Sequence, residues 1–178
     1  MGQTPSIHTL AFLGRSQELQ RLSLDGTDVI HPREGGKTTL HFATDEQHAG
    51  AVGLLLSLGA DPDATDDDGN TPLHLLCSQN PRERDLDGAL RIYHALISAH
   101  AKVNLQNLQG ATPLHLALEC QAIDLALLLI TSGADPLLRN NDGDTSHDLV
   151  RVWSHPLLEE ALGEPVTQPP SLEMREVA

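Results

Sequence analysis

Aromatic residues are nearly absent from this chain, because Phe, Trp and Tyr together make up 2% of its 178 residues. A core must therefore be built from Leu, Ala, Ile and Val, within an apolar content of 39%. Large sandwiches and barrels usually recruit β-branched and aromatic residues, whereas thin, closely packed helices do not need them. The composition favours a helical repeat array.

Basic residues are also scarce: 11 Lys and Arg stand against 25 Asp and Glu, for a formal net charge of −14. Binding of nucleic acid requires clustered Lys and Arg, and an anionic membrane surface attracts the same residues. We therefore expect no nucleic-acid and no membrane partner. A protein partner with a basic surface would be attracted, although acidity also has the simpler effect of keeping a chain soluble.

Cysteines and long apolar runs are lacking as well. Cys77 and Cys120 alone complete neither a four-ligand zinc site nor a disulfide framework. The longest apolar run, residues 125–130, is far shorter than the roughly 20 residues of a membrane-spanning helix. The first residues lack the basic region of a signal peptide. These absences predict a cytoplasmic protein, and we expect it to be monomeric when free.

What the sequence does contain is a repeated pattern. Three segments share one arrangement of Gly, Thr, Leu and His: Gly36-Lys-Thr-Thr-Leu-His, Gly69-Asn-Thr-Pro-Leu-His and Gly110-Ala-Thr-Pro-Leu-His. The first two begin 33 residues apart and the last two 41 apart, so one unit carries eight extra residues. Fainter counterparts, around His8 on one side and Thr145 on the other, extend the register to five units.

Thr-Pro-Leu-His within a period of 33 residues resembles the ankyrin-repeat family, and the resemblance covers roughly residues 4–162. It implies an all-α repeat solenoid, a stack of helix-turn-helix units joined by β-turn or hairpin loops. We expect repeats at approximately 4–34, 35–67, 68–108, 109–141 and 142–162, followed by a disordered tail over 163–178.

The residue types agree with this resemblance. Thr71 and Thr112 can cap a first helix whose first turn accepts the following proline. Gly59 and Gly133 stand where the chain must leave a second helix in the left-handed conformation, which glycine tolerates best. His100 takes that place in the third repeat, which marks a local weak point.

His41, His74 and His115 recur at one place in successive repeats, and the resemblance implies that each binds backbone in the neighbouring turn. Their expected separation of roughly 10 Å is too large for two of them to bind one metal ion. No nucleophile, histidine and acid combination emerges. We expect no catalysis, metal or cofactor; the rival hypothesis is an enzyme with a site around residues 80–87 and Cys120.

In ankyrin stacks, as the resemblance implies, the turn tips and the exposed face of the first helix form a concave groove. Trp153, the only Trp, falls on an exposed place there; Trp is typical of interface hot spots, unless the tail folds back and covers it. The groove predicted by phase is acidic and polar: Asp45, Glu46, Asp67, Asp68, Asn70, Ser78, Gln79, Leu108, Gln109, Glu119, Asn141, Asp142, Asp144 and Trp153.

The eight extra residues, around 80–87, are expected to lengthen the connection between the helices of the third repeat. They form either a tolerated surface loop or a second contact element in which Arg82 and Arg84 supply positive charge. The chain therefore reads as a non-enzymatic protein-protein interaction module for a partner with a basic patch. Narrower alternatives are a small inhibitor or immunity-type protein that occludes a toxin or enzyme, and a bacterial or viral effector that mimics host ankyrin proteins.

Overall fold

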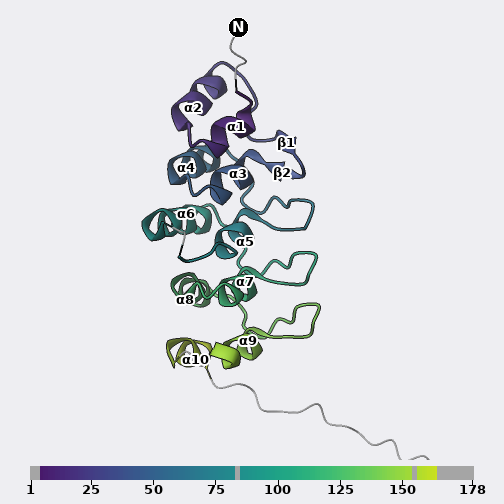
Figure 1. The fold of residues 1–178 in the computed structure, drawn as a ribbon. Helices are drawn as coiled ribbons and strands as arrows, with labels where there is room; N and C mark the ends of the chain where they lie inside the picture. Colours follow the sequence, from purple (N-terminus) through teal and green to yellow (C-terminus); the bar gives the residue numbers. More distant parts are fainter. Residues whose placement is uncertain (1–4, 83–84, 154–155, 164–178) are drawn as a thin grey trace, which may run out of the picture.

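The computed structural model describes residues 5–82, 85–153 and 156–163, without the side chains of residues 151–153. Its helices follow one another in pairs, and the pairs stack so that their helices form two rows (Figure 1). The inner row lies beside the loops that connect the pairs, and the outer row lies on the side away from them. The inner row is α1 (Ile7–Phe12), α3 (Thr39–Asp45), α5 (Pro72–Cys77), α7 (Pro113–Glu119) and α9 (Ser146–Trp153). The outer row is α2 (Ser16–Leu24), α4 (Ala49–Ser57), α6 (Leu86–Ser98), α8 (Ile123–Thr131) and α10 (Pro156–Leu162). The expected all-α repeat solenoid is confirmed.

Two inner helices begin at the predicted caps Thr71 and Thr112, and a third, α3, begins at Thr38 in the same way. The Thr71 hydroxyl oxygen accepts from the N–H of His74, and the N–H of Thr71 donates to His74 Nδ1 at 3.2 Å. Proline fills the first turn of α5 and α7, where no intrahelical N–H is needed. Each such capping box satisfies orphan groups of the helix start reciprocally. The same box joins Thr38 to His41 and Thr112 to His115.

The three histidines of these boxes also join each helix pair to the next, as predicted. All three imidazoles are fully buried. Their Nε2 atoms lie within hydrogen-bond distance of a backbone carbonyl in the following loop: His41 to Asn70 at 3.0 Å, His74 to Ala111 at 3.1 Å and His115 to Asp144 at 3.2 Å.

The first helix pair departs from this arrangement. Ser6 caps α1 and accepts from the N–H of Thr9, which holds the place that histidine has in the three boxes. His8, which the 33-residue count aligned with His41, lies one position earlier, and its Nδ1 is 3.1 Å from Glu34 Oε2. The count was therefore wrong by one residue at the start of α1.

The core runs between the two rows and is mainly aliphatic, as the composition required. Leu73, Leu114 and Leu129 are fully buried, together with the small side chains that let the helices approach closely. One aromatic residue joins them: Tyr93 is 1% exposed, and its hydroxyl donates to the carbonyl of Leu128 at 2.8 Å. The buried hydroxyl thus has the partner that burial demands.

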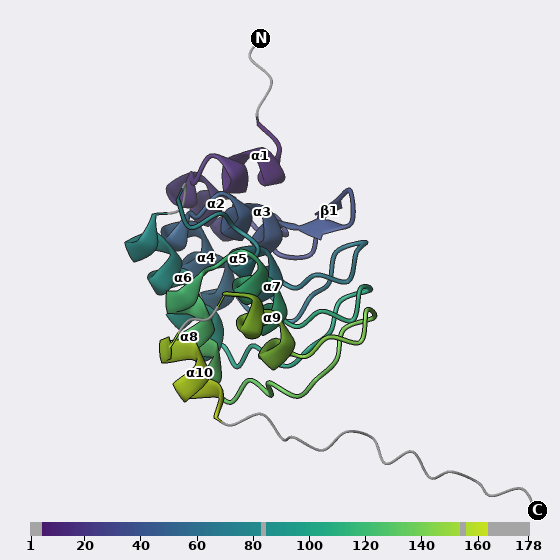
Figure 2. The same ribbon diagram turned by 60° about the horizontal axis from the view of Figure 1, so that its bottom comes forward.

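Between successive pairs the chain extends to one side in long hairpin-like loops (Figures 1 and 2). The first contains two short antiparallel strands, β1 (Arg33–Glu34) and β2 (Lys37–Thr38). At later tips Gly69 and Gly143 have φ values of 77° and 88°, a left-handed conformation that glycine adopts readily in a tight turn. At Gly110 an added Cβ would lie 2.6 Å from the Oδ1 atom of Asn141, so adjacent tips stack closely.

After α4, α6 and α8 the chain leaves the helix through a residue in the left-handed conformation. Gly59 and Gly133 follow α4 and α8 with φ values of 91° and 90°. His100 follows α6 with φ 64°, as predicted, although it carries a Cβ. That conformation costs an ordinary residue about 1–2 kcal/mol.

The eight extra residues are only partly a loop. The connection between α5 and α6 spans 78–85, against 120–122 between α7 and α8, and α6 has 13 residues against nine in α8. Asp85 caps α6 by accepting from the N–H of Gly88 at 3.1 Å. The expectation that residues 80–87 form only a connection was therefore wrong for Leu86 and Asp87, which are helical.

No helix in the described part of the chain is long and apolar enough to cross a bilayer. The predicted tail, 163–178, lies outside the described residues apart from Gly163. The division into five repeats at the boundaries given above stays a prediction.

Candidate functional site

The predicted groove residues lie at the ends of inner helices and along the hairpin loops. Leu108, 67% exposed, and the exposed Gln109 lie at one tip. Six of the groove carboxylates are exposed and are called the acidic set below: Glu46, Asp67, Asp68, Glu119, Asp142 and Asp144.

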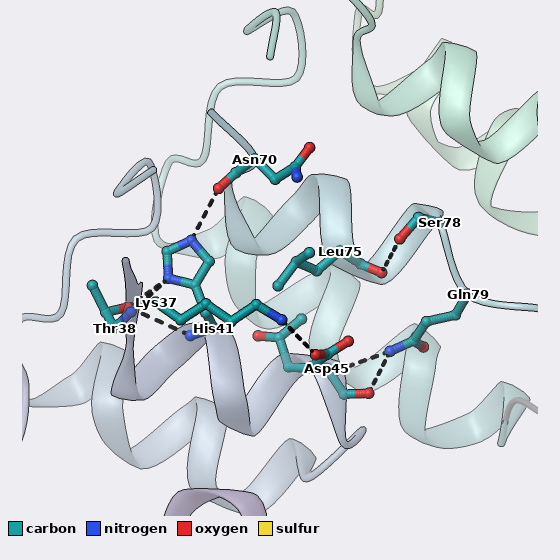
Figure 3. Close-up of polar contacts among 9 residues, drawn as sticks. Lys37, Thr38, His41, Asp45, Asn70, Leu75, Ser78 and Gln79 are labelled. Atoms are coloured by element: carbon teal, nitrogen blue, oxygen red, sulfur yellow. Dashed lines mark hydrogen bonds and ion pairs between the residues drawn. The ribbon is translucent and has the colours of Figure 1, made fainter. Parts of the chain in front are cut away.

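Asp45 differs from the acidic set because it already has a cationic partner. Lys37 Nζ lies 2.9 Å from Asp45 Oδ2, and the two side chains are 30% and 40% exposed (Figure 3). The ammonium group offsets the carboxylate charge. Asp45 therefore adds less negative potential to this surface than its sequence position suggests.

Ser78 and Gln79 use their polar groups within the chain. Gln79 Nε2 donates to the carbonyls of Thr44 at 3.2 Å and Asp45 at 2.7 Å, and the Ser78 hydroxyl donates to the carbonyl of Leu75 (Figure 3). The Thr44 carbonyl also accepts from the N–H of Gln47, whereas Gln79 supplies a donor to the Asp45 carbonyl at the helix end. Gln79 thus ties the end of α3 to the start of the insertion. This role was not foreseen from the sequence.

Asn70 also has a structural role, since its carbonyl accepts from His41 and its Oδ1 accepts from Asn107 Nδ2 at 2.9 Å. Asn107 Oδ1 in turn accepts from the N–H of Ala111 at 2.9 Å. Sequence reasoning missed Asn107. Its position in the repeat could have identified it, because Asp66 stands at the same place in the preceding loop and accepts from the N–H of Asn70 at 2.8 Å.

Glu119 lies in the most crowded negative surroundings of the acidic set. Partial burial raises the pKa of its carboxyl above the ordinary value. His115 opposes this rise, whereas Asp142 and Asp144 add to it. A cation brought to this point would relieve the mutual repulsion of the three carboxylates.

Other predicted positions are placed only in part. The side chain of Trp153, and Arg84 as a whole, lie outside the described residues. Arg82 is exposed in the connection before α6. Phe12 and Leu13, at the corresponding end of α1, are 47% and 50% exposed.

The thiols and the metal-binding residue types show no reactive arrangement within the described ranges. No group of three or more His, Cys, Asp and Glu side chains there could hold a metal ion. Cys77 is buried. The Cys120 Sγ donates to the carbonyl of Ser78 at 3.2 Å, so this thiol contacts the preceding repeat.

A hollow of about 650 Å³, to which no sequence pattern pointed, opens at the α1–α2 end of the stack. Glu18 and Arg21 contribute one charge of each sign to its wall, so the hollow adds no net charge. The rest of its wall is mainly apolar and includes Pro5, Ile7, Leu10, Leu22 and Pro32.

Comparison with known proteins gives a consistent picture. A family model described as ankyrin repeats (3 copies) matches residues 7–107 and 40–140. Neurogenic locus notch homolog protein 1 of Mus musculus is 32% identical over 145 residues, which are 81% of this chain and 5% of that protein. The Homo sapiens protein of the same name is 31% identical over the same length. A putative ankyrin repeat protein of Rickettsia felis is 35% identical over 102 residues, which are 54% of this chain and 43% of that protein. The chain thus spans 5% of the length of the notch relatives.

Proposed function

The chain belongs to the ankyrin-repeat family, whose repeats generally mediate protein–protein interaction, and we propose that it binds a partner protein with a basic patch through the acidic set. The family is typically a non-enzymatic interaction module. The observation that carries the proposal is the repetition of exposed carboxylates at the ends of inner helices and on the hairpin loops.

The charge of this surface has little internal compensation. Among the described residues, Lys37 is the one base that forms an ion pair with a predicted groove residue, and its partner is Asp45. The formal net charge of −14 adds a long-range field of the same sign. Such a field steers a basic partner toward the surface and is screened by salt.

A double charge reversal tests the proposal. Glu119→Lys with Asp142→Lys replaces two negative charges of the acidic set with positive ones, whereas Glu159→Lys with Glu160→Lys makes the same change in net charge on exposed positions of α10. A protein captured from native cell extract by the unaltered chain should be lost by the first variant and kept by the second.

Salt provides the second arm of the test. The affinity for the captured protein should fall as salt is raised, because exposed charges are screened over roughly 8–10 Å at physiological ionic strength. Circular dichroism spectra of both variants should match that of the unaltered chain. Equal binding by the two variants, or an affinity that salt does not change, would contradict the acidic-set proposal.

A further inference from the structure

The inner histidines are each held in one tautomer by groups that cannot exchange roles. The N–H of Thr38 donates to His41 Nδ1 at 3.1 Å, and a peptide N–H can only donate, so Nδ1 carries no proton. The ring proton therefore sits on Nε2, which donates to the carbonyl of Asn70 at 3.0 Å. A neutral ring thus connects the start of α3 to the following loop.

The arrangement repeats at the next two joints with nearly the same distances. At each joint a Thr N–H donates to Nδ1, and Nε2 donates to a carbonyl of the next loop. The distances are 3.2 Å from Thr71 and 3.1 Å to Ala111 for His74, and 3.2 Å from Thr112 and 3.2 Å to Asp144 for His115.

We propose that His41 and His74 make the stack acid-sensitive, because a proton on Nδ1 removes the acceptor of the Thr N–H at the cap of the inner helix and disturbs the bond to the following repeat. A proton on Nδ1 would point at the peptide N–H that now donates to it. The Thr hydroxyl, 2.7 Å from Nδ1 of His41 and 2.9 Å from Nδ1 of His74, can accept that proton only if the ring turns toward it. The peptide N–H then loses its acceptor, and the turn strains the bond from Nε2 to the following loop. Because the rings are fully buried, no water replaces the lost bonds until the joint opens.

Some charged groups around the rings favour protonation of the histidine and others oppose it. Asp66 favours the protonated form of His41 and of His74, whereas Arg33 and Lys37 disfavour it at His41. Burial is the largest influence at both rings and lowers the pKa of each below its ordinary value. The closed joints therefore exclude the proton despite the nearby carboxylate.

The sign of the pH effect follows from that exclusion. An unfolded histidine titrates near pH 6.5, so below that value the opened joint at His41 or His74 binds a proton that the closed joint does not. Stability is full above about pH 6.5 and is lost as the pH falls toward the lower folded value. Glu119, which interacts with His115, acts in the opposite sense because its pKa is raised in the folded chain.

The α1–α3 contact uses different groups and should resist acid. Thr9 holds the histidine place in α1. His48 Nε2 lies 2.8 Å from the carbonyl of Phe12, and His8 Nδ1 lies 3.1 Å from Glu34 Oε2. Acid should therefore open the joints that follow α3 and α5 and leave the α1–α4 pairs together.

Residue-resolved amide hydrogen exchange tests the proposal on the full chain. The amides of Thr38 and Thr71 report on the joints, and those of Leu13 and Arg15, bonded within the first pair, serve as references. Between about pH 7.5 and about pH 5.5, with intrinsic rates corrected, joint protection should fall up to about tenfold per pH unit below pH 6.5. Reference protection should change much less. An equal change at both sets of amides, or none at either, would overturn the proposal.

A pair of variants identifies the titrating group. His74→Gln removes one joint histidine, and His94→Gln removes an exposed histidine of α6 as the matched control. The first should reduce the pH dependence of the unfolding equilibrium by up to about tenfold per pH unit, and the second should leave it unchanged. If both variants keep the pH dependence of the unaltered chain, the joints are not the sensors. If His74→Gln does not fold, exchange in the unaltered chain decides alone.

Discussion

The α5–α6 pair and the α7–α8 pair start from the same capping box and use different amounts of chain. Their inner helices start with the same box, in which Nδ1 of the histidine lies 2.9 Å from the Thr hydroxyl in α5 and 2.8 Å in α7. Their outer helices differ, since α6 is four residues longer than α8 and follows a longer connection. The inner helix and its joint are thus fixed by four contiguous residues, and the outer side of the repeat absorbs the variation.

The longer connection is fastened at both ends to the preceding helix pair. Gln79 donates to the end of α3, and the N–H of Asp85 donates to Gln47 Oε1 at 2.8 Å. Lengthening a loop costs little closure entropy when its ends are already held. The expanded repeat is therefore held to the helix pair before it despite its longer connection.

The largest expected loss of stability comes from truncating the equivalent core leucine of each inner helix. Leu73→Ala and Leu114→Ala should each lower the free energy of unfolding by about 2–5 kcal/mol, because both side chains are fully buried. Urea denaturation would measure both. Leu86→Ala, at a position 47% exposed, is the control and should change stability by less than about 1 kcal/mol. A much smaller loss at Leu73 than at Leu114 would mean that the expanded repeat is loosely packed.

This equivalence also shows how far the sequence alone could lead. Caps, core positions and joint histidines could be predicted because each depends on residues within one turn or on a strict period. The start of α6 at Leu86 also depends on the N–H of Asp85 donating to Gln47, 38 residues before Asp85, and that contact could not be predicted. The same limit applies to the candidate site. The position of Asp45 in the repeat predicts that it lies on the surface, but its ion pair with Lys37 could be known only from the folded structure.

Removing the cap hydroxyl should have an intermediate effect and should be equal in the two repeats. Thr71→Ala and Thr112→Ala each delete the oxygen that accepts from the histidine N–H, at an expected cost of about 1 kcal/mol and at most about 2. Thr71→Ser keeps the oxygen and is the control. Urea midpoints that fall for one Thr→Ala variant but not for the other would show that the boxes are not equivalent despite their matching distances.

The smallest expected change in stability concerns the residue that follows the outer helix, which is His in one repeat and Gly in the other. His100 follows α6 with φ 64°, and Gly133 follows α8 with φ 90°. Exchanging these residues should change stability in opposite directions: His100→Gly should stabilise and Gly133→His should destabilise, each by about 0.5 kcal/mol. This is the left-handed penalty of a side chain less the extra chain entropy of glycine. No atom lies within 4 Å of a Cβ built at Gly133, so the backbone alone decides the outcome there. Calorimetric melting of both variants would measure the two shifts. Shifts of the same sign would mean that side-chain contacts of His100, and not its backbone conformation, set the difference between the repeats.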